Sequence, residues 1–215
     1  KALKLHEKLK GKIEIKAKIK VDNKNLPLLY TPGVAEIVKI ISKNKINSYK
    51  YTIKNNTIAI VSDGSRILGL GNLGGEAALP VMEGKSLLYK IYGNINAIPI
   101  CLKTQNKKEI INVVENISIN FGAINIEDIE APKCFEIVNK LSRNLNIPVF
   151  HDDQHGTAVV VLAALINALK LVKKNLAKAR IIILGAGAAG YGITNLLSYA
   201  GAKNILVLDS HGIIY

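Results

Sequence analysis

The stretch from Ala179 to Asp209 constrains the fold of this chain more than any other. An apolar run, Ile181–Leu184, precedes the glycine-rich loop Gly185-Ala186-Gly187-Ala188-Ala189-Gly190, a helical pattern and a second apolar run that ends at Asp209. These glycines permit a tight turn and let backbone N–H groups approach a pyrophosphate at a helix N-terminus, while an acid about 20 residues later suits ribose hydroxyls. The segment predicts a βαβ unit that binds NAD, with close helix–strand packing as the alternative.

The rest of the chain also alternates short apolar runs with helical patterns, so the predicted fold class is α/β. We expect strands at Thr57–Ser62, Ala97–Leu102, Ala123–Ile126 and Ile147–Phe150. A boundary near Asn175 separates residues 1–174, an α/β domain with a long connecting helix, from residues 175–215, the start of a Rossmann-type dinucleotide-binding domain. Because one βαβ unit cannot close a sheet of its own, we expect about a hundred further residues of that second domain downstream.

Three helical patterns bear on the site. Pro32–Lys43 predicts a helix with Thr31 as its cap, since proline is favoured at the first helical position. Glu76–Lys90 predicts a helix that is interrupted near Gly84. Gly156–Lys174 is apolar on most faces, so we expect this helix to be buried.

Composition argues against several classes of protein. The net charge is +13, but the lysines are spread along the chain and no basic stripe or aromatic interleaving appears, so we expect no nucleic-acid partner. We find no apolar stretch of transmembrane length and no signal peptide, so we expect no membrane partner. Cys101 and Cys134 lack disulfide or metal spacing, which indicates a cytoplasmic protein.

Two acidic clusters each follow an apolar run, the first at Glu127-Asp128 and the second at Asp152-Asp153. Ligands of open α/β sheets sit at the carboxyl ends of strands, and four carboxylates converging there would repel one another without a cation. Oxygen ligands favour Mg²⁺ or Mn²⁺. Glu127, Asp128 and Asp153 are therefore candidate metal ligands. Each pair alone also fits a structural role as charges or caps at a helix N-terminus.

Three further residues are candidates for substrate chemistry. A lysine out of water beside a divalent cation has a lowered pKa and can act as a general base, so Lys85 is a candidate, although most lysines are solvated. Tyr30 stands at a helix entrance, where its hydroxyl relays a proton or only staples the helix. Arg66 suits a substrate carboxylate or is a surface arginine. The loop Gly69–Gly74 that follows lacks the acid of a dinucleotide site, and its backbone is open to a small ligand.

Several motifs resemble those of the malic enzymes. They are Tyr30-Thr31-Pro32-Gly33-Val34-Ala35, Val61-Ser62-Asp63-Gly64, Leu68-Gly69-Leu70-Gly71-Asn72-Leu73-Gly74, Leu79-Pro80-Val81-Met82-Glu83-Gly84-Lys85, Ile126-Glu127-Asp128-Ile129 and His151-Asp152-Asp153-Gln154-His155-Gly156-Thr157-Ala158. Their order and spacing match the short bacterial and archaeal form, and the resemblance spans essentially the whole chain. That family continues past the last residue of this chain.

The resemblance implies oxidative decarboxylation of malate to pyruvate and CO₂ with reduction of NAD(P)⁺. By motif match, Lys85 takes the proton from the C2 hydroxyl, and Tyr30 protonates the enol of pyruvate at C3. Asp152 sits beside Lys85, and Arg66 holds a substrate carboxylate.

The resemblance also implies that Glu127, Asp128 and Asp153 hold the Mg²⁺ or Mn²⁺ ion. Asp209 favours NAD over NADP, because a carboxylate repels a 2′-phosphate, although NADP stays open. Family members are commonly dimers, so we expect a homodimer whose alternating arm, Ile13–Val21, crosses to the partner.

Two other functions stay open on the residues alone. One is a metal-independent dehydrogenase of the amino-acid type, which a chelator would not affect. The other is a noncatalytic dinucleotide-binding module, which would bind NAD without malate-dependent reduction.

Overall fold

The computed structural model describes residues 1–214 and contains two sheets. The first has the order β2-β1-β3-β4, and all its strands are parallel. Its strands are β1 (Thr57–Ser62), β2 (Asn96–Cys101), β3 (Ala123–Ile126) and β4 (Val149–His151). The second has the order β5-β6-β7, with β5 parallel to β6 and β7 antiparallel. Its strands are β5 (Arg180–Leu184), β6 (Asn204–Asp209) and β7 (Gly212–Ile214). The predicted α/β class and the six predicted strands are confirmed, whereas β7 was missed.

Helices cover both faces of the first sheet. Helix α5 (Gly75–Gly93) packs on one face through Ala78 and Met82, which contact Ile60 of β1. Helices α6 (Lys107–Ile117) and α7 (Lys133–Asn144) pack on the other face around β1 and β3. Because successive strand residues point to opposite faces, β1 contributes to both cores. Its carboxyl end is therefore held firmly, and the loops that follow β1, β3 and β4 share one edge.

Helix α5 runs without a break through Pro80 and Gly84, so the predicted interruption near Gly84 is wrong. Glycine costs a helix interior about 1 kcal/mol relative to alanine. Here burial of one face of the helix outweighs that cost, since Ala78, Met82 and Ser86 are buried against the sheet. The continuous helix places Lys85 on the side of α5 that faces the carboxyl end of β3.

Helix α8 (Thr157–Leu171) joins the two sheets and packs against α9 (Ala188–Tyr199), but it is not buried as predicted. Val160 is 65% exposed and Leu171 is 85% exposed, because the described residues leave the outer face of α8 uncovered. The helical run Asp152–Leu171 is also long and apolar enough to cross a membrane, by length and composition alone. The expectation that no apolar stretch of the chain reaches transmembrane length is therefore wrong.

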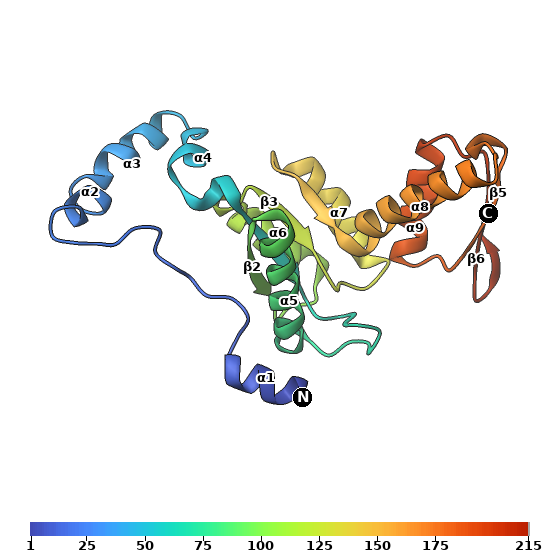
Figure 1. The fold of residues 1–215 in the computed structure, drawn as a ribbon, viewed down its shortest axis with the longest axis horizontal. Helices are drawn as coiled ribbons and strands as arrows, with labels where there is room; N and C mark the ends of the chain where they lie inside the picture. Colours follow the sequence, from blue (N-terminus) through green and yellow to red (C-terminus); the bar gives the residue numbers. More distant parts are fainter. Residues whose placement is uncertain (215) are drawn as a thin grey trace.

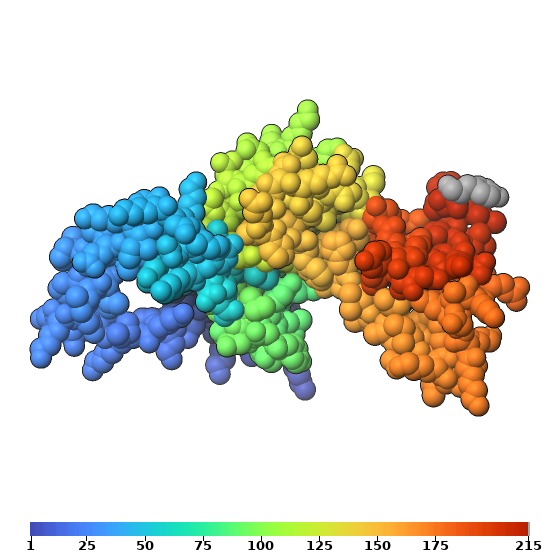
Figure 2. Space-filling model, turned by 90° about the horizontal axis from the view of Figure 1, so that it is seen from above, coloured from blue at the N-terminus to red at the C-terminus, as the bar shows by residue number. Residues whose placement is uncertain are grey.

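The N-terminal third forms an arm at one end of the molecule, while α8, α9 and the second sheet lie at the other end (Figures 1 and 2). The helix predicted from Pro32 begins instead at Val34, with Gly33 before it and no side-chain cap from Thr31. The segment Ile13–Val21 is extended and pairs with no strand among the described residues. The helices of the arm are α1 (Ala2–Leu9), α2 (Leu26–Leu29), α3 (Val34–Lys43) and α4 (Asn47–Tyr51), and the remaining short helices are η1 (Ile53–Asn56), η2 (Ser118–Asn120), the π-helix η3 (Asp152–Gly156) and η4 (Leu176–Lys178).

The boundary predicted near Asn175 falls between α8 and η4. Asn175 is the N-cap of η4, and its side chain accepts a hydrogen bond from the backbone N–H of Ala177 at 2.8 Å. The division into residues 1–174 and 175–215 stays a prediction.

Candidate active site

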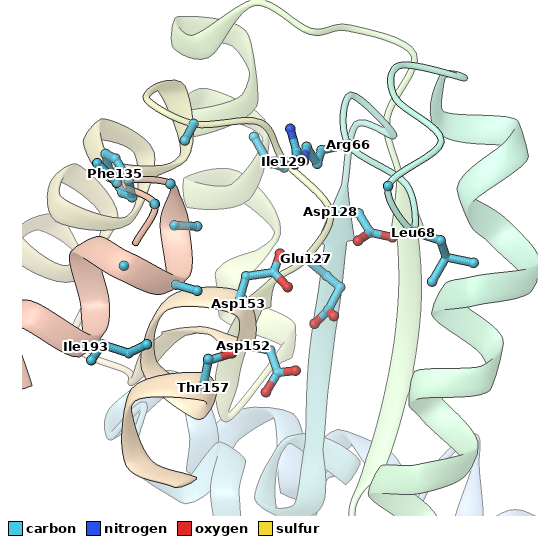
Figure 3. A pocket seen from close by; sticks show the side chains of 18 of the residues that line it. Arg66, Leu68, Glu127, Asp128, Ile129, Phe135, Asp152, Asp153, Thr157 and Ile193 are labelled. Carbon is cyan, nitrogen blue, oxygen red and sulfur yellow. The ribbon is translucent and has the colours of Figure 1, made fainter. Parts of the chain in front are cut away.

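A cleft of about 1030 Å³ lies between the carboxyl edge of the first sheet and the glycine-rich loop after β5. Both predicted acidic clusters and Arg66 line this cleft (Figure 3). Lys85 lines it as well. The opposite wall is Gly185–Gly190. Residues that lie far apart in the sequence therefore meet in one place, at the edge where α/β proteins bind ligands.

Lys85 forms ion pairs with two of the carboxylates that line the cleft. Its Nζ lies 2.8 Å from Oδ2 of Asp152 and 2.9 Å from Oε1 of Glu127. Burial favours the neutral amine, but the hydrogen bonds and charges of Asp152 and Glu127 outweigh it and raise the pKa of Lys85 above its ordinary range. Lys85 is therefore an ammonium ion in this arrangement, and the lowering of its pKa by a neighbouring divalent cation stays a prediction.

Glu127 stands at the carboxyl end of β3 and is 4% exposed. Burial raises its pKa, and the contacts with Lys85 and Asn125 oppose that rise. The Asn125 side chain donates to Oε2 of Glu127 at 2.8 Å. Sequence analysis did not single out Asn125, although strand periodicity places residues 125 and 127 on one face. Each oxygen of Glu127 is thus held by a different donor.

Asp128 has an unusual backbone and an unsatisfied side chain. Its φ is 51°, a left-handed conformation that is uncommon outside glycine, and its carbonyl accepts the backbone N–H of Arg66 at 3.1 Å. The buried Oδ2 has no hydrogen-bond partner in the described structure. Burial, followed by the charges of Glu127 and Asp153, raises the pKa of Asp128 to about 6. Backbone strain of this kind persists where the surrounding structure enforces it, and it clusters at functional sites.

Asp152 and Asp153 lie in the first turn of the π-helical segment η3, which follows β4 and continues directly into α8. His151, which precedes the turn, is fully buried, and its Nε2 lies 3.6 Å from Oδ2 of Asp153. That contact lowers the pKa of Asp153, and burial opposes the change. Gly192 of α9 lies against the backbone carbonyl of Gln154, so helix α9 packs directly on the turn η3.

The predicted metal ligands share the cleft without forming a ready binding site. Among residues 1–214, no three acidic, histidine or cysteine side chains stand close enough together to hold a metal ion. Glu127 is engaged with Lys85 and Asn125, while Asp153 contacts His151. The unpartnered oxygen of Asp128 and the mutual repulsion of Glu127, Asp128 and Asp153 fit a cation. The metal assignment stays a prediction.

Arg66 is held on a loop that a buried network locks in place. Asp63 is fully buried, and its carboxylate accepts from Lys133 Nζ at 2.6 Å and from Ser65 Oγ at 2.6 Å. Ser65 Oγ in turn accepts the backbone N–H of Glu130 at 2.9 Å, which ties the loop after β1 to the loop after β3. Sequence analysis missed this network, because a lone Asp and a lone Lys far apart in the chain carry no pattern.

The glycine-rich loop after β5 has the geometry of a dinucleotide turn. Gly185 has a φ of 108°, and a Cβ at Gly190 would overlap the carbonyl oxygen of Gly185. A Cβ at Gly187 would meet nothing within 4 Å, so that side of the loop is open to the cleft. Asp209 ends β6 outside the cleft lining, and its Oδ1 accepts the backbone N–H of His211 at 2.7 Å. The cofactor-binding roles of these residues stay predictions.

Tyr30 is the one predicted catalytic residue that the structure does not bring to the cleft. It lies between α2 and α3 in the arm and is 69% exposed. A different tyrosine, Tyr89, stands one turn after Lys85 on α5, and burial followed by the charges of Glu127 and Asp152 raises its pKa to about 12. Tyr89 packs against the core on the α5 side of the sheet and is absent from the cleft lining.

Comparison with known proteins supports the resemblance seen in the motifs. Residues 10–112 match the family model of the malic enzyme N-terminal domain, and residues 154–214 match that of the malic enzyme NAD binding domain. The chain is 52% identical over 206 residues to an NAD-dependent malic enzyme of Geobacillus stearothermophilus, covering 95% of this chain and 43% of that protein. It is 49% identical to a bifunctional malic/malolactic enzyme of Bacillus subtilis, covering all of this chain and 52% of that protein.

The fold agrees as well. A crystal structure of an NAD-dependent malic enzyme from Thermotoga maritima superposes with a TM-score of 0.96 at 50% identity, covering 99% of this chain and 57% of that one. The chain thus spans about half the length of the curated relatives that it matches. Two family models in the expected order, relatives near 50% identity and one shared fold lead to a single conclusion: the chain belongs to the malic enzyme family.

Proposed function

We propose that the protein containing this chain oxidises malate with NAD(P)⁺ and decarboxylates the product to pyruvate and CO₂. The observation that carries the proposal is the position of Lys85, which lies between Glu127 and Asp152 in a cleft whose far wall is the dinucleotide loop. A proton-transfer group, an arginine for a carboxylate and a nicotinamide cofactor are the parts that this reaction needs. All three would be reached from one cleft.

The roles of the side chains follow from their contacts. Arg66 binds a substrate carboxylate with its planar guanidinium, held by the loop that Asp63 and Lys133 fix. Lys85 exchanges a proton with the C2 hydroxyl of malate. Because its ion pairs keep it protonated, Lys85 becomes a base only when Glu127 gives up their contact.

We further propose that Glu127, Asp128 and Asp153 hold a divalent ion, Mg²⁺ or Mn²⁺. When bound, such an ion polarises the carbonyl that forms at C2. The support is chemical: all three groups offer hard oxygen ligands, and one of them has a buried oxygen without a partner. Glu127 would exchange its contact with Lys85 for this role, which also frees Lys85.

The cofactor, assembly and location follow as proposals of the same kind. Asp209 ends β6, and its proposed role is to accept the ribose hydroxyls, which favours NAD over NADP. NADP-dependent malic enzymes are also among the relatives, such as that of Halomonas elongata at 47% identity. We propose a cytoplasmic location, since both cysteines, Cys101 and Cys134, are free and a reducing compartment suits them. We also propose that the protein is a homodimer.

The test is NADH formation on the full-length protein with malate and Mn²⁺, with and without a chelator. We expect malate-dependent NADH that chelation abolishes, and slower reduction of NADP⁺. Lys85→Ala should lower kcat by about 10²- to 10⁴-fold. Lys90→Ala is the matched control, because Lys90 lies on the same helix but contacts only Asn94 and Asn96 on the surface.

Each alternative gives a different result in this assay. Activity that survives the chelator would favour a metal-independent dehydrogenase. NAD binding without any malate-dependent NADH would favour a noncatalytic module and would contradict the proposal.

A further inference from the structure

The start of helix α9 is docked on the elements around the first sheet. Ala188, the first residue of the helix, packs against the apolar core that α6 and α7 form with that sheet. Nearly one turn later, the ring of Tyr191 stacks on the ring of Phe135 in α7, with the centroids 4.4 Å apart and 30° between the planes. Gly192 then lies against the backbone carbonyl of Gln154, where a Cβ would overlap the oxygen. These contacts fix the position of α9 relative to the acidic edge.

Tyr191 lies outside the cleft, although its partner borders it. Tyr191 is absent from the cleft lining and is 39% exposed. Phe135 lines the cleft, and so does Ile193, which follows Tyr191 on α9 (Figure 3). The ring pair therefore lies where the α7 wall of the cleft meets α9. Stacked rings attract each other beyond the burial of their surface, so this contact favours one relative position of the two helices.

Each ring is tied firmly to one wall of the cleft. The backbone N–H of Tyr191 donates to the carbonyl of Gly187 at 2.9 Å, and Gly187 is the N-cap of α9 and part of the dinucleotide loop. On the other side, α7 begins at Lys133, shortly after Asp128, and Ile137 of α7 is fully buried against the first sheet. A shift between the two rings would therefore move the dinucleotide loop relative to the acids.

We infer that Tyr191 is a positioning residue for hydride transfer, which acts through Phe135 to set the distance between the dinucleotide loop and the acidic edge. The reacting atoms of such a step must lie about 3–3.5 Å apart, and a displacement of about 1 Å can cost about 100-fold in rate. Binding of NAD⁺ or of malate needs only one wall of the cleft. The inference rests on the proposed function, and it assigns a role to a residue that touches neither reactant.

The deuterium isotope effect on the full-length protein tests this role. Tyr191→Ala should lower kcat for malate-dependent NADH formation by about 10- to 100-fold. Malate that carries deuterium at C2 should show a larger isotope effect on kcat in this variant than in the wild type, because hydride transfer becomes the slow step. The affinity for NAD⁺, measured by titration calorimetry, and the KM for malate should stay close to the wild-type values.

Two control variants on the same helix separate the stack from other effects. Tyr191→Phe keeps the ring, so it should restore both kcat and the isotope effect of the wild type. Tyr199→Ala removes the tyrosine that ends α9, which is 92% exposed and remote from the ring pair in the sequence of the helix. This variant should behave as the wild type. Loss of activity in Tyr191→Phe would mean that the hydroxyl matters, and it would contradict a role through stacking.

A double variant tests whether Tyr191 acts through Phe135. Phe135→Leu keeps an apolar side chain at the border of the cleft but removes the ring. If the two residues act as one unit, Phe135→Leu/Tyr191→Ala should be no slower than the slower of the two single variants. Losses in kcat that multiply in the double variant would show independent roles and would overturn the inference.

Other outcomes of the kinetic experiment also decide against the inference. A lower kcat with an unchanged isotope effect would mean that the stack only supports the fold. An NAD⁺ affinity that falls as much as kcat would mean that Tyr191 shapes the dinucleotide loop instead of placing it. A wild type without malate-dependent NADH contradicts the proposed function, and a distance measurement then decides the role of Tyr191.

Spin labels measure the placement of α9 without any activity. Nitroxide labels are attached to Ile119→Cys, near the amino end of β3, and to Tyr199→Cys, in a Cys101→Ala background with Cys134 fully buried. Labelled protein is refolded with excess unlabelled protein, so that distances within one chain are measured. The distance distribution should broaden or shift in Tyr191→Ala and stay unchanged in Tyr191→Phe. An unchanged distribution in Tyr191→Ala would overturn the inference, whether or not the wild type is active.

Discussion

The two sheets have similar apolar strands but very different surroundings. In the first sheet, Ala59, Ile60 and Val61 of β1 are all fully buried, with helices on both faces. In the second, Ile182 and Leu184 of β5 are 65% and 82% exposed. Strands of parallel sheets are normally buried on both faces, and their sequences read as continuous apolar runs. The composition of a strand thus indicates that it will be covered, but not which segment of chain covers it.

The largest difference between the two sheets is expected when the acid at the end of a strand is replaced, measured as the loss in the free energy of unfolding. Asp63, just after β1, is fully buried and paired with Lys133, whose side chain is 15% exposed. Asp63→Ala would strand that buried charge, so we expect a loss of about 3–5 kcal/mol in the free energy of unfolding. Asp209→Ala removes only surface contacts with His211, to its backbone N–H and to its imidazole, and should cost about 1 kcal/mol or less. Urea unfolding measures both.

The variants Asp63→Ala and Asp209→Ala also separate an effect on stability from an effect on NAD⁺ binding. NAD⁺ affinity should fall in Asp209→Ala, measured by titration calorimetry on folded protein. An Asp209→Ala variant that unfolds as readily as Asp63→Ala would mean that Asp209 supports the fold instead of the ribose.

Matched substitutions in β3 and β5 test whether the outer face of the second sheet is exposed to solvent in solution. Ile126→Ala in β3 removes a fully buried side chain and should cost about 2–5 kcal/mol. Ile182→Ala removes one that is 65% exposed and should change the free energy of unfolding by about 0.5 kcal/mol or less. Urea unfolding of the 215-residue chain gives both values. Equal losses would show that the outer face of β5 is covered in solution, for example by association.

Sequence analysis succeeded where the physical signal is local. The strand after Thr57, the loop at Gly185 and the position of the acids at strand ends all follow from short-range periodicity and from ligand sites at strand ends. Burial of α8 was predicted wrongly because an apolar helix does not reveal which part of the chain covers it. The pKa of Lys85 depends on two carboxylates that reach it only in the folded chain. Tyr30 was placed by motif alone, and no pattern reports a distance between distant segments.

Two glycines of the dinucleotide loop extend the comparison to a ligand. A Cβ at Gly190 would overlap the backbone of Gly185, whereas one at Gly187 meets nothing. Gly190→Ala should therefore lower the free energy of unfolding by about 1–3 kcal/mol and also weaken NAD⁺ binding. Gly187→Ala should leave stability within about 0.5 kcal/mol and still weaken binding, because its methyl group would occupy the space of the pyrophosphate. Unaltered NAD⁺ affinity in Gly187→Ala would argue against the loop as the cofactor site.

A thiol at the end of each sheet gives the smallest and most local test. Cys101 ends β2, and burial followed by the charge of Asp128 raises the pKa of its thiol to about 11. Since only the thiolate reacts, Cys101 should be modified by a maleimide at pH 8 on the order of 100-fold more slowly than an exposed thiol.

The matched exposed thiol is Leu184→Cys at the end of β5, made in a Cys101→Ala background, with Cys134 fully buried in both proteins. Asp128→Asn should speed the modification of Cys101 and leave Leu184→Cys unchanged. Equal rates at the two positions would mean that the carboxyl edge of the first sheet is open to water, which contradicts the buried, charge-rich cleft described above.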